Sequence, residues 1–270
     1  ERRMKEQKYT GIKIITALIT GAGILRLSAM LLRDRGPEMA MAVPAYLISI
    51  AVMVLLAVFF GEKDRITEFR RGWKTFFTRG WYILMVSGVF ALMTAIGLSQ
   101  EKEAVFSPVK FAGFAVVCLL TACFEEIWFR GIIQGILEKY GKAKLQGFWK
   151  TACITSAMFG AMHLMNLIHR PDYIIGTVTQ VLYAFSLGMI LSMILYSGGN
   201  IGVAILLHAV FNFSGSLSEV FVRQAGTQAG DMPIASAVFI LVLMMPGVIY
   251  ARRTYKKIER EPVFARKRFG

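Results

Sequence analysis

The sequence contains few charged residues and no polar stretch long enough to form a soluble domain. Charged residues make up 18% of the 270 positions and hydrophobic residues 56%, and the mean hydropathy is +0.55. The longest connections between apolar runs, 61–79 and 132–148, are far shorter than the roughly 50 residues of a small domain. This composition excludes an ordinary soluble protein and predicts a polytopic membrane protein.

Two further features are missing, a disulfide framework and a cleavable signal peptide. The three cysteines, Cys118, Cys123 and Cys153, all lie inside apolar runs, so we expect small buried side chains rather than disulfide partners. The polar, basic start ERRMKEQKYT lacks the pattern of a cleaved leader and precedes an apolar run of full length. We therefore expect this first run to be retained as a membrane span.

Eight apolar runs have the length needed to cross a hydrocarbon core roughly 30 Å thick. Backbone groups in lipid must be hydrogen-bonded within the chain, so we expect an all-α fold, a transmembrane helix bundle of about eight spans. With no long polar segment, residues 1–270 should form a single integral-membrane domain. The expected spans are 11–32, 41–60, 80–99, 109–131, 149–168, 173–196, 200–222 and 233–251.

The net charge of +14 comes from basic residues in the N-terminal segment, in connections 61–79 and 132–148, and in 252–270. They do not form the aromatic-laced patch of a nucleic-acid-binding protein, so no nucleic-acid partner is expected. The positive-inside rule instead predicts that both termini are cytoplasmic. We expect 252–270 to be a basic cytoplasmic tail, and the two connections to be either amphipathic segments on the leaflet or solvated loops.

The stretch EEIWFR places three charges inside the fourth apolar run. Such charges cost roughly 2.5 to 3.5 kcal/mol at the centre of a membrane helix, and usually pair or face a functional cavity. Glu126 and Arg130 are four positions apart and share a helix face, whereas Glu125 points about 100° away. We expect Glu126 and Arg130 to form a structural pair, which leaves Glu125 available as a general base. Arg26 also lies in an apolar run, the first one. We expect it to have a structural role or to extend its charged group to the membrane interface.

Two of the three histidines also lie within apolar runs. His163 ends the stretch FGAMH, which begins at Phe159, and His208 begins the stretch HAVFN, which ends at Asn212. The third, His169, lies at the end of a run and is expected to be an interfacial loop residue. A lone histidine or asparagine in a span is more often a hydrogen-bond partner between helices than a catalytic group. Polar side chains on three separate spans instead favour a functional site.

These stretches resemble the motifs of a known family. EEIWFR resembles the EExxxR motif, FGAMH the FxxxH motif and HAVFN the HxxxN motif of the CPBP family. That family comprises CAAX prenyl endopeptidases and bacterial Abi or bacteriocin-processing intramembrane proteases. All three motifs occur in the family's order, and the resemblance covers roughly 109–217. It implies an eight-helix intramembrane endopeptidase, which we expect in a bacterial cytoplasmic membrane.

The resemblance also implies roles for individual residues. Glu125 and His163 would activate a water molecule, and His208 and Asn212 would stabilise the oxyanion. Glu125 is also the glutamate that helix spacing leaves without a partner, independently of the resemblance. The expected substrate is a membrane-associated or lipidated peptide or protein, cleaved in a cavity open to the cytoplasmic side or laterally to lipid. Supporting, structural roles are expected for Glu126, Arg130 and Phe159.

A metal cofactor and other functions are alternatives. Glu125, His163 and His208 match the ligand types of a catalytic zinc site, but they lie on three helices and there is no H-E-x-x-H pair. The sequence therefore leaves the cofactor unknown: either no metal binds, or a divalent metal such as zinc is held by these three residues. The same polar cluster would suit a non-enzymatic immunity or scaffold protein that binds a peptide. A proton-relaying transporter is less favoured, because the sequence shows no repeated halves.

Overall fold

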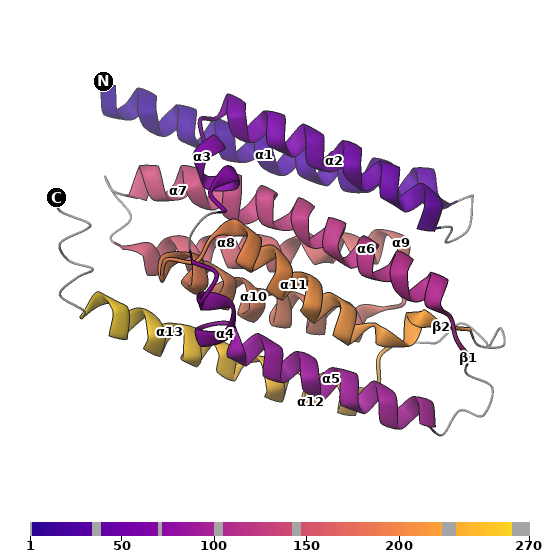
Figure 1. Ribbon diagram of the computed structural model, residues 1–270. Helices are drawn as coiled ribbons and strands as arrows, with labels where there is room; N and C mark the ends of the chain where they lie inside the picture. The colour runs from indigo at the N-terminus through magenta and orange to yellow at the C-terminus, as the bar shows by residue number, and fades with distance from the viewer. Residues whose placement is uncertain are drawn as a thin grey trace.

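The structure is a computed structural model in which a bundle of long helices runs along a common direction (Figure 1). The structure describes residues 2–33, 39–69, 72–99, 105–141, 147–222 and 231–260.

The long helices carry the fold, and shorter helical segments and a pair of strands connect them. The long helices are α1 (Arg2–Arg33), α2 (Met39–Phe59), α5 (Trp81–Ser99), α6 (Pro108–Glu126), α8 (Phe148–Met162), α10 (Ile174–Tyr196), α11 (Ile201–Gly215), α12 (Ile234–Met244) and α13 (Pro246–Glu259). The short helices are α3 (Lys63–Thr67), α4 (Thr75–Thr78), α7 (Gln134–Gly141) and α9 (Asn166–His169). A π-helix, η1 (Ile127–Ile133), joins α6 to α7, and two 3-10 turns are η2 (His163–Met165) and η3 (Leu217–Val220). The strands are β1 (Val105–Phe106) and β2 (Phe221–Val222).

Seven helical segments of the described chain are long and apolar enough to cross a membrane. An eighth apolar helix, α11, has 15 residues and is shorter than the others. The expectation of an all-helical bundle of membrane spans is therefore confirmed, and the chain is an integral membrane protein. Helix α11 is shorter than the apolar run 200–222 suggested.

The seventh expected span, 200–222, was too long. Helix α11 ends at Gly215, and the chain then passes through η3 into β2. Strand β2 pairs antiparallel with β1, with Val222 opposite Val105 and Phe221 opposite Phe106. Hydrophobicity alone could not reveal this end, because the residues of β2 are as apolar as those of the helix. Two-residue strands also leave no periodicity to detect.

The fourth expected span, 109–131, was too short. The helix continues from α6 through η1 and α7 to Gly141, so the start of the expected connection 132–148 is helical. Ile136 and Leu137 of α7 are buried, which gives this part of the connection a packed apolar side. The remainder of the connection, 142–146, lies outside the described residues.

The last expected span, 233–251, also ends too early. Helix α13 continues to Glu259, within the segment expected to be a basic tail. Tyr255 and Ile258 are buried against the bundle, so the basic side chains here lie on a helix with a packed face. Residues 261–270 of the tail lie outside the described chain.

Helix α10 is the most buried of the spans, with 61% of its apolar window inside the protein. Its residues join α5, α8, α11 and α13 in one apolar core. A second core packs α1 and α2 against η1 and α8. The polar residues of the EEIWFR stretch lie beside this second core, between the two groups of helices.

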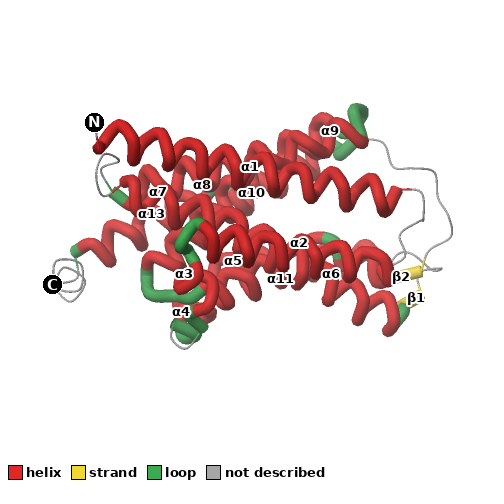
Figure 2. Tube along the Cα trace, turned by 90° about the horizontal axis from the view of Figure 1, so that it is seen from above, coloured by secondary structure: helices red, strands yellow, loops and turns green. Residues whose placement is uncertain are grey.

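The bundle has two distinguishable ends (Figures 1 and 2). Helix α1 begins and α13 ends at one of them, which we call the terminal end. Strands β1 and β2 pair at the other, which we call the strand end. Because the described chain starts and finishes at one end, its long helical segments make an even number of passes through the bundle.

Gly160 sets the distance between α8 and α10. A Cβ atom at this position would lie 2.6 Å from the carbonyl oxygen of Val181. A backbone atom in a packed helix cannot move aside without a cost in free energy.

We expect Gly160→Ala to lower the free energy of unfolding by about 1–3 kcal/mol, measured by thermal unfolding in detergent. Gly88 in α5 is the control, because a Cβ there meets nothing within 4 Å. Gly88→Ala should be neutral or stabilise by up to about 1 kcal/mol. Equal effects of the two variants would contradict this packing.

Candidate active site

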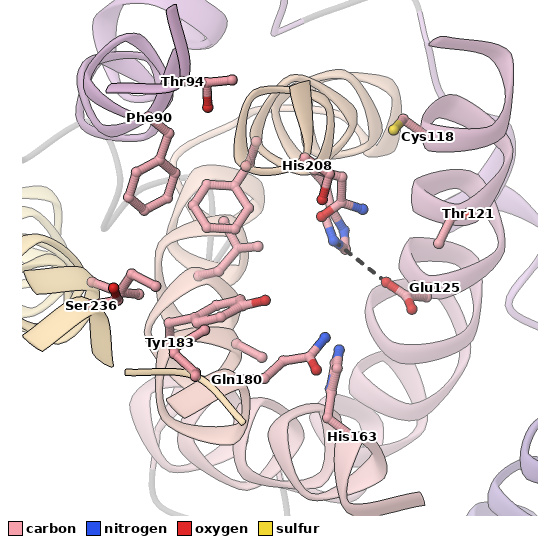
Figure 3. A pocket seen from close by; sticks show the side chains of 18 of the residues that line it. Phe90, Thr94, Cys118, Thr121, Glu125, His163, Gln180, Tyr183, His208 and Ser236 are labelled. Atoms are coloured by element: carbon pink, nitrogen blue, oxygen red, sulfur yellow. Dashed lines mark ion pairs between the residues drawn. The ribbon is translucent and has the colours of Figure 1, made fainter. Parts of the chain in front are cut away.

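A cavity of about 860 Å³ lies between the helices, and Figure 3 shows it from close by. Its lining residues belong to the half of the bundle nearest the strand end. The structure brings Glu125, His163, His208 and Asn212 together in its wall, from α6, η2 and α11. Sequence spacing could not establish this convergence. Much of the remaining wall is aromatic, formed by Phe90, Phe114, Phe159, Tyr173, Tyr183, Phe211 and Phe239.

His208 lies between the two adjacent glutamates. Its Nδ1 atom is 2.8 Å from Glu126 Oε1, and its Nε2 atom is 3.4 Å from Glu125 Oε2. A carboxylate accepts hydrogen bonds, so Nδ1 carries a hydrogen and donates it to Glu126. This bond fixes the orientation of the ring and directs Nε2 toward Glu125 and the cavity. Figure 3 shows the Glu125–His208 pair across the cavity.

Glu126 and Arg130 form a fully buried ion pair, as their spacing suggested. Glu126 Oε1 lies 3.0 Å from Arg130 Nη1, and both residues are 0% exposed. The sequence did not reveal that the same Oε1 atom also bonds His208, on α11. Glu126 therefore links the EEIWFR segment to α11 as well as to Arg130.

Phe159 forms an aromatic wall behind both histidines. Its ring centroid lies 5.2 Å from that of His163 and 5.7 Å from that of His208, each in an edge-to-face arrangement. The Arg130 guanidinium lies over the same ring, 4.4 Å from its centroid, in cation–π geometry. Phe159 therefore limits the positions open to both imidazoles and covers the buried ion pair.

His163 stands where α8 ends and η2 begins. Its Nδ1 atom is 3.0 Å from the backbone oxygen of Phe159. Since a carbonyl only accepts, Nδ1 must be the protonated nitrogen. In the neutral ring Nε2 is then an acceptor, which suits a group that orients a water molecule.

Gln180 of α10 is a cavity residue that sequence reasoning missed. It lines the wall beside His163 (Figure 3), and its Oε1 atom accepts a hydrogen bond from Asn166 Nδ2 at 2.8 Å. An uncharged polar residue within the apolar run 173–196 was the available signal. Asparagine and glutamine recur in spans as hydrogen-bond partners between helices, so this signal is weak without the fold.

Asp231 anchors the segment before α12 to the start of α10. Its two carboxylate oxygens accept hydrogen bonds from the backbone amides of Ile175 and Gly176, at 2.6 and 2.9 Å. Desolvation raises the pKa of this carboxyl, but hydrogen bonds from backbone amides outweigh it, so the pKa lies below its usual value. The carboxylate thereby holds the α12 side of the cavity wall against α10.

The described residues contain no group of three or more His, Cys, Asp or Glu side chains placed to hold a metal ion. The alternative zinc set of Glu125, His163 and His208 therefore does not form a ligand cluster in this structure.

The fold and the site together define a class, a membrane-spanning helical protein with a glutamate–histidine cluster in an internal cavity. Residues 107–214 match the family described as type II CAAX prenyl endopeptidase, Rce1-like. This part of the chain is thus an Rce1-like type II CAAX prenyl endopeptidase family domain, and the resemblance inferred from the three motifs is confirmed. No curated protein was found to match the chain. Membership of this family implies an intramembrane protease with a peptide or protein substrate.

A double-mutant cycle tests the buried ion pair. Glu126→Gln leaves Arg130 without its counter-ion, and we expect a loss of about 3–5 kcal/mol in the free energy of unfolding. Arg130→Met alone should be similarly destabilising. The two substitutions combined should cost much less than the sum of the single effects, because the uncompensated charge is gone.

The matched control for this cycle is the Arg65–Glu138 pair, which is partly exposed, with an Nη1–Oε2 distance of 2.7 Å. Arg65→Met and Glu138→Gln should show a coupling of no more than about 1 kcal/mol. Thermal unfolding in detergent measures both cycles. Additive effects at Glu126 and Arg130 would contradict a buried pair.

Proposed function

We propose that the chain hydrolyses a peptide bond of a membrane-associated or lipidated peptide or protein, using a water molecule activated by Glu125 and His163. The observation that carries this proposal is the convergence of Glu125, His163, His208 and Asn212 on one cavity. The cavity is polar at this cluster, and aromatic and aliphatic side chains form most of the remaining wall. It therefore suits a substrate with an apolar segment or chain beside the bond to be cut.

The nucleophile is the water molecule bound between Glu125 and His163. Glu125 accepts one proton from it as the oxygen attacks the peptide carbonyl. His163 accepts a hydrogen bond from the second proton at Nε2, the nitrogen left free by the bond between Nδ1 and Phe159. Two acceptors directed at one water fix its lone pair for attack, which is the orientation that general base catalysis requires.

The carbonyl oxygen becomes negatively charged as the water attacks. His208 donates to this oxyanion from Nε2, and Asn212 donates from its side-chain amide. Glu126 supports the first donor, because its bond to Nδ1 holds the ring with Nε2 directed toward the oxyanion. Such donors are effective when they are already oriented in a site of low dielectric constant.

The tetrahedral intermediate collapses when the C–N bond breaks. The proton held by Glu125 passes to the departing nitrogen, which leaves as an amine, and the acyl carbon becomes a carboxylic acid. Glu125 is then a carboxylate again. The same residue thus acts first as base and then as acid, as in other two-step proton transfers.

The rival proposal is a non-enzymatic immunity or scaffold protein that binds a peptide in the same cavity. A protein that only binds a peptide requires no water-activating base, so the Glu125→Gln variant distinguishes this function from peptide hydrolysis. This variant keeps the shape of the side chain and removes the proton acceptor.

We expect Glu125→Gln to reduce turnover by about 10²- to 10⁴-fold and Asn212→Ala by about 10²- to 10³-fold, with the fold unchanged. The measurement compares, by mass spectrometry, peptides released from membranes of cells with wild type or variant. Glu138→Gln is the control, because Glu138 lies outside the cavity and pairs with Arg65. Identical peptide profiles in wild type and Glu125→Gln would favour the scaffold.

We also propose that both termini are cytoplasmic. The basic connections 61–79 and 132–148 and the basic segment 252–260 join or follow helices at the terminal end of the bundle, which the positive-inside rule assigns to the cytoplasm. The cavity lies toward the strand end, between the second halves of α5 and α11 and the first halves of α10 and α12. With cytoplasmic termini, the cavity lies nearer the opposite side of the membrane. Of the two openings expected from the sequence, cytoplasmic or lateral to lipid, this proposal disfavours the cytoplasmic one.

Thiol labelling of intact cells tests this orientation. In a variant lacking Cys118, Cys123 and Cys153, a cysteine is placed at Ser216, an exposed residue of the cavity wall, or at Thr78, exposed near the terminal end. A membrane-impermeant maleimide should label Ser216→Cys directly, and Thr78→Cys only after permeabilisation. The reverse pattern would place the termini outside.

A further inference from the structure

A second, smaller cavity of about 360 Å³ adjoins the candidate active site. It lies among residues of α1, α2, η1, α8, α9 and α10. Glu125, Phe159, His163 and Gln180 line this cavity as well as the larger one. The proposed water-activating pair therefore stands between two chambers, and a peptide bond held at Glu125 has space on both sides.

Arg26 lines the smaller cavity. It lies near the end of the apolar window Tyr9–Leu27 of α1 and is exposed. Among the described residues, the buried Arg130 has Glu126 as its counter-ion, and Arg65 has Glu138. No carboxylate of the described chain pairs with Arg26, so its guanidinium has its donors available to a bound anion.

The smaller cavity has other polar residues besides Arg26, among apolar ones such as Trp128 and Phe129. Tyr46 and Ser49 of α2 line it together with Asn166 and Gln180, which are hydrogen-bonded to each other. These side chains suit the backbone and polar groups of a short peptide segment. An apolar chain would be better solvated by the aromatic wall of the larger cavity.

We propose that the smaller cavity binds the residues on one side of the scissile bond, and that Arg26 selects substrates that carry a carboxylate there. The carboxylate is either the free C-terminus of the peptide or an acidic side chain, both of which offer the same bidentate partner to a guanidinium. This inference rests on the proposed peptidase function. A peptide is favoured over a lipid headgroup because the cavity is continuous with Glu125 and His163, which a lipid at the surface of α1 would not need to reach.

The probe is a quenched-fluorescence library of apolar peptides in three matched forms. The first has a free C-terminal carboxylate, the second a C-terminal amide, and the third an amide together with one internal glutamate. Full-length protein in neutral lipid nanodiscs should cleave the carboxylate forms with a KM on the order of 10-fold lower than the plain amide. Arg26→Gln should remove this difference with little change in kcat, and Arg26→Lys should restore part of it.

Lys13→Gln is the matched control, because it removes a cation from the same helix at a position that lines neither cavity. It should keep the preference for a carboxylate. The first and third peptide forms distinguish a C-terminal carboxylate from an acidic side chain. A preference unchanged by Arg26→Gln overturns the proposal. The proposal is also overturned if Arg26→Gln changes the binding of anionic lipid in the nanodisc but not the binding of the peptides. Arg26 would then be a contact for lipid headgroups.

A binding experiment separates this inference from the proposed chemistry. Glu125→Gln protein should still bind the carboxylate library about 10-fold more tightly than the amide library, and adding Arg26→Gln should abolish that difference. If wild type cleaves nothing but this binding preference is present, the peptidase proposal fails and the carboxylate site stands. If the binding preference is missing, the carboxylate site fails whether or not cleavage occurs.

Discussion

The structure depends on one buried carboxylate, that of Glu126. It is fully buried. It accepts hydrogen bonds from Arg130, one turn further along the same helical segment, and from His208 on the neighbouring helix α11. An isolated charge at such a depth is too costly to retain, so these contacts are needed for the fold as well as for the site. The carboxylate ties α6 and η1 to α11, and it fixes the orientation of the imidazole that faces Glu125.

This arrangement separates two adjacent glutamates by role. Glu126 is directed into the bundle and paired with Arg130, while Glu125 faces the cavities, with its Oε2 atom 3.4 Å from His208 Nε2. The π-helical turn that follows them is fully buried, and π-helical segments are frequent at functional sites because they alter the facing of neighbouring side chains. Packing on Phe159 then limits the movement of both histidines. The support for the chemistry is thus built from aromatic and ionic contacts inside the apolar core.

The larger and smaller cavities give the two sides of the site different chemical character. The larger one has many aromatic residues in its wall. The smaller one has aromatic residues too, but it also contains a cation, Arg26. Glu125 and His163 belong to both. A reaction centre between unlike chambers can distinguish the two ends of a bound peptide, which a single symmetrical cavity cannot do.

The sequence by itself determined the membrane-spanning class and the side chains that are neighbours on one helix. Apolar runs located the spans, and four-residue spacing placed Glu126 beside Arg130 and Phe159 beside His163, because helix geometry depends on local sequence. Apolar runs misplaced the ends at Gly215 and Glu259, where packing rather than hydrophobicity ends a helix. Only the tertiary structure decided that His208 bonds Glu126, 82 positions away, and that two cavities meet at Glu125. Contacts between helices follow from how the whole bundle packs, which no local pattern encodes.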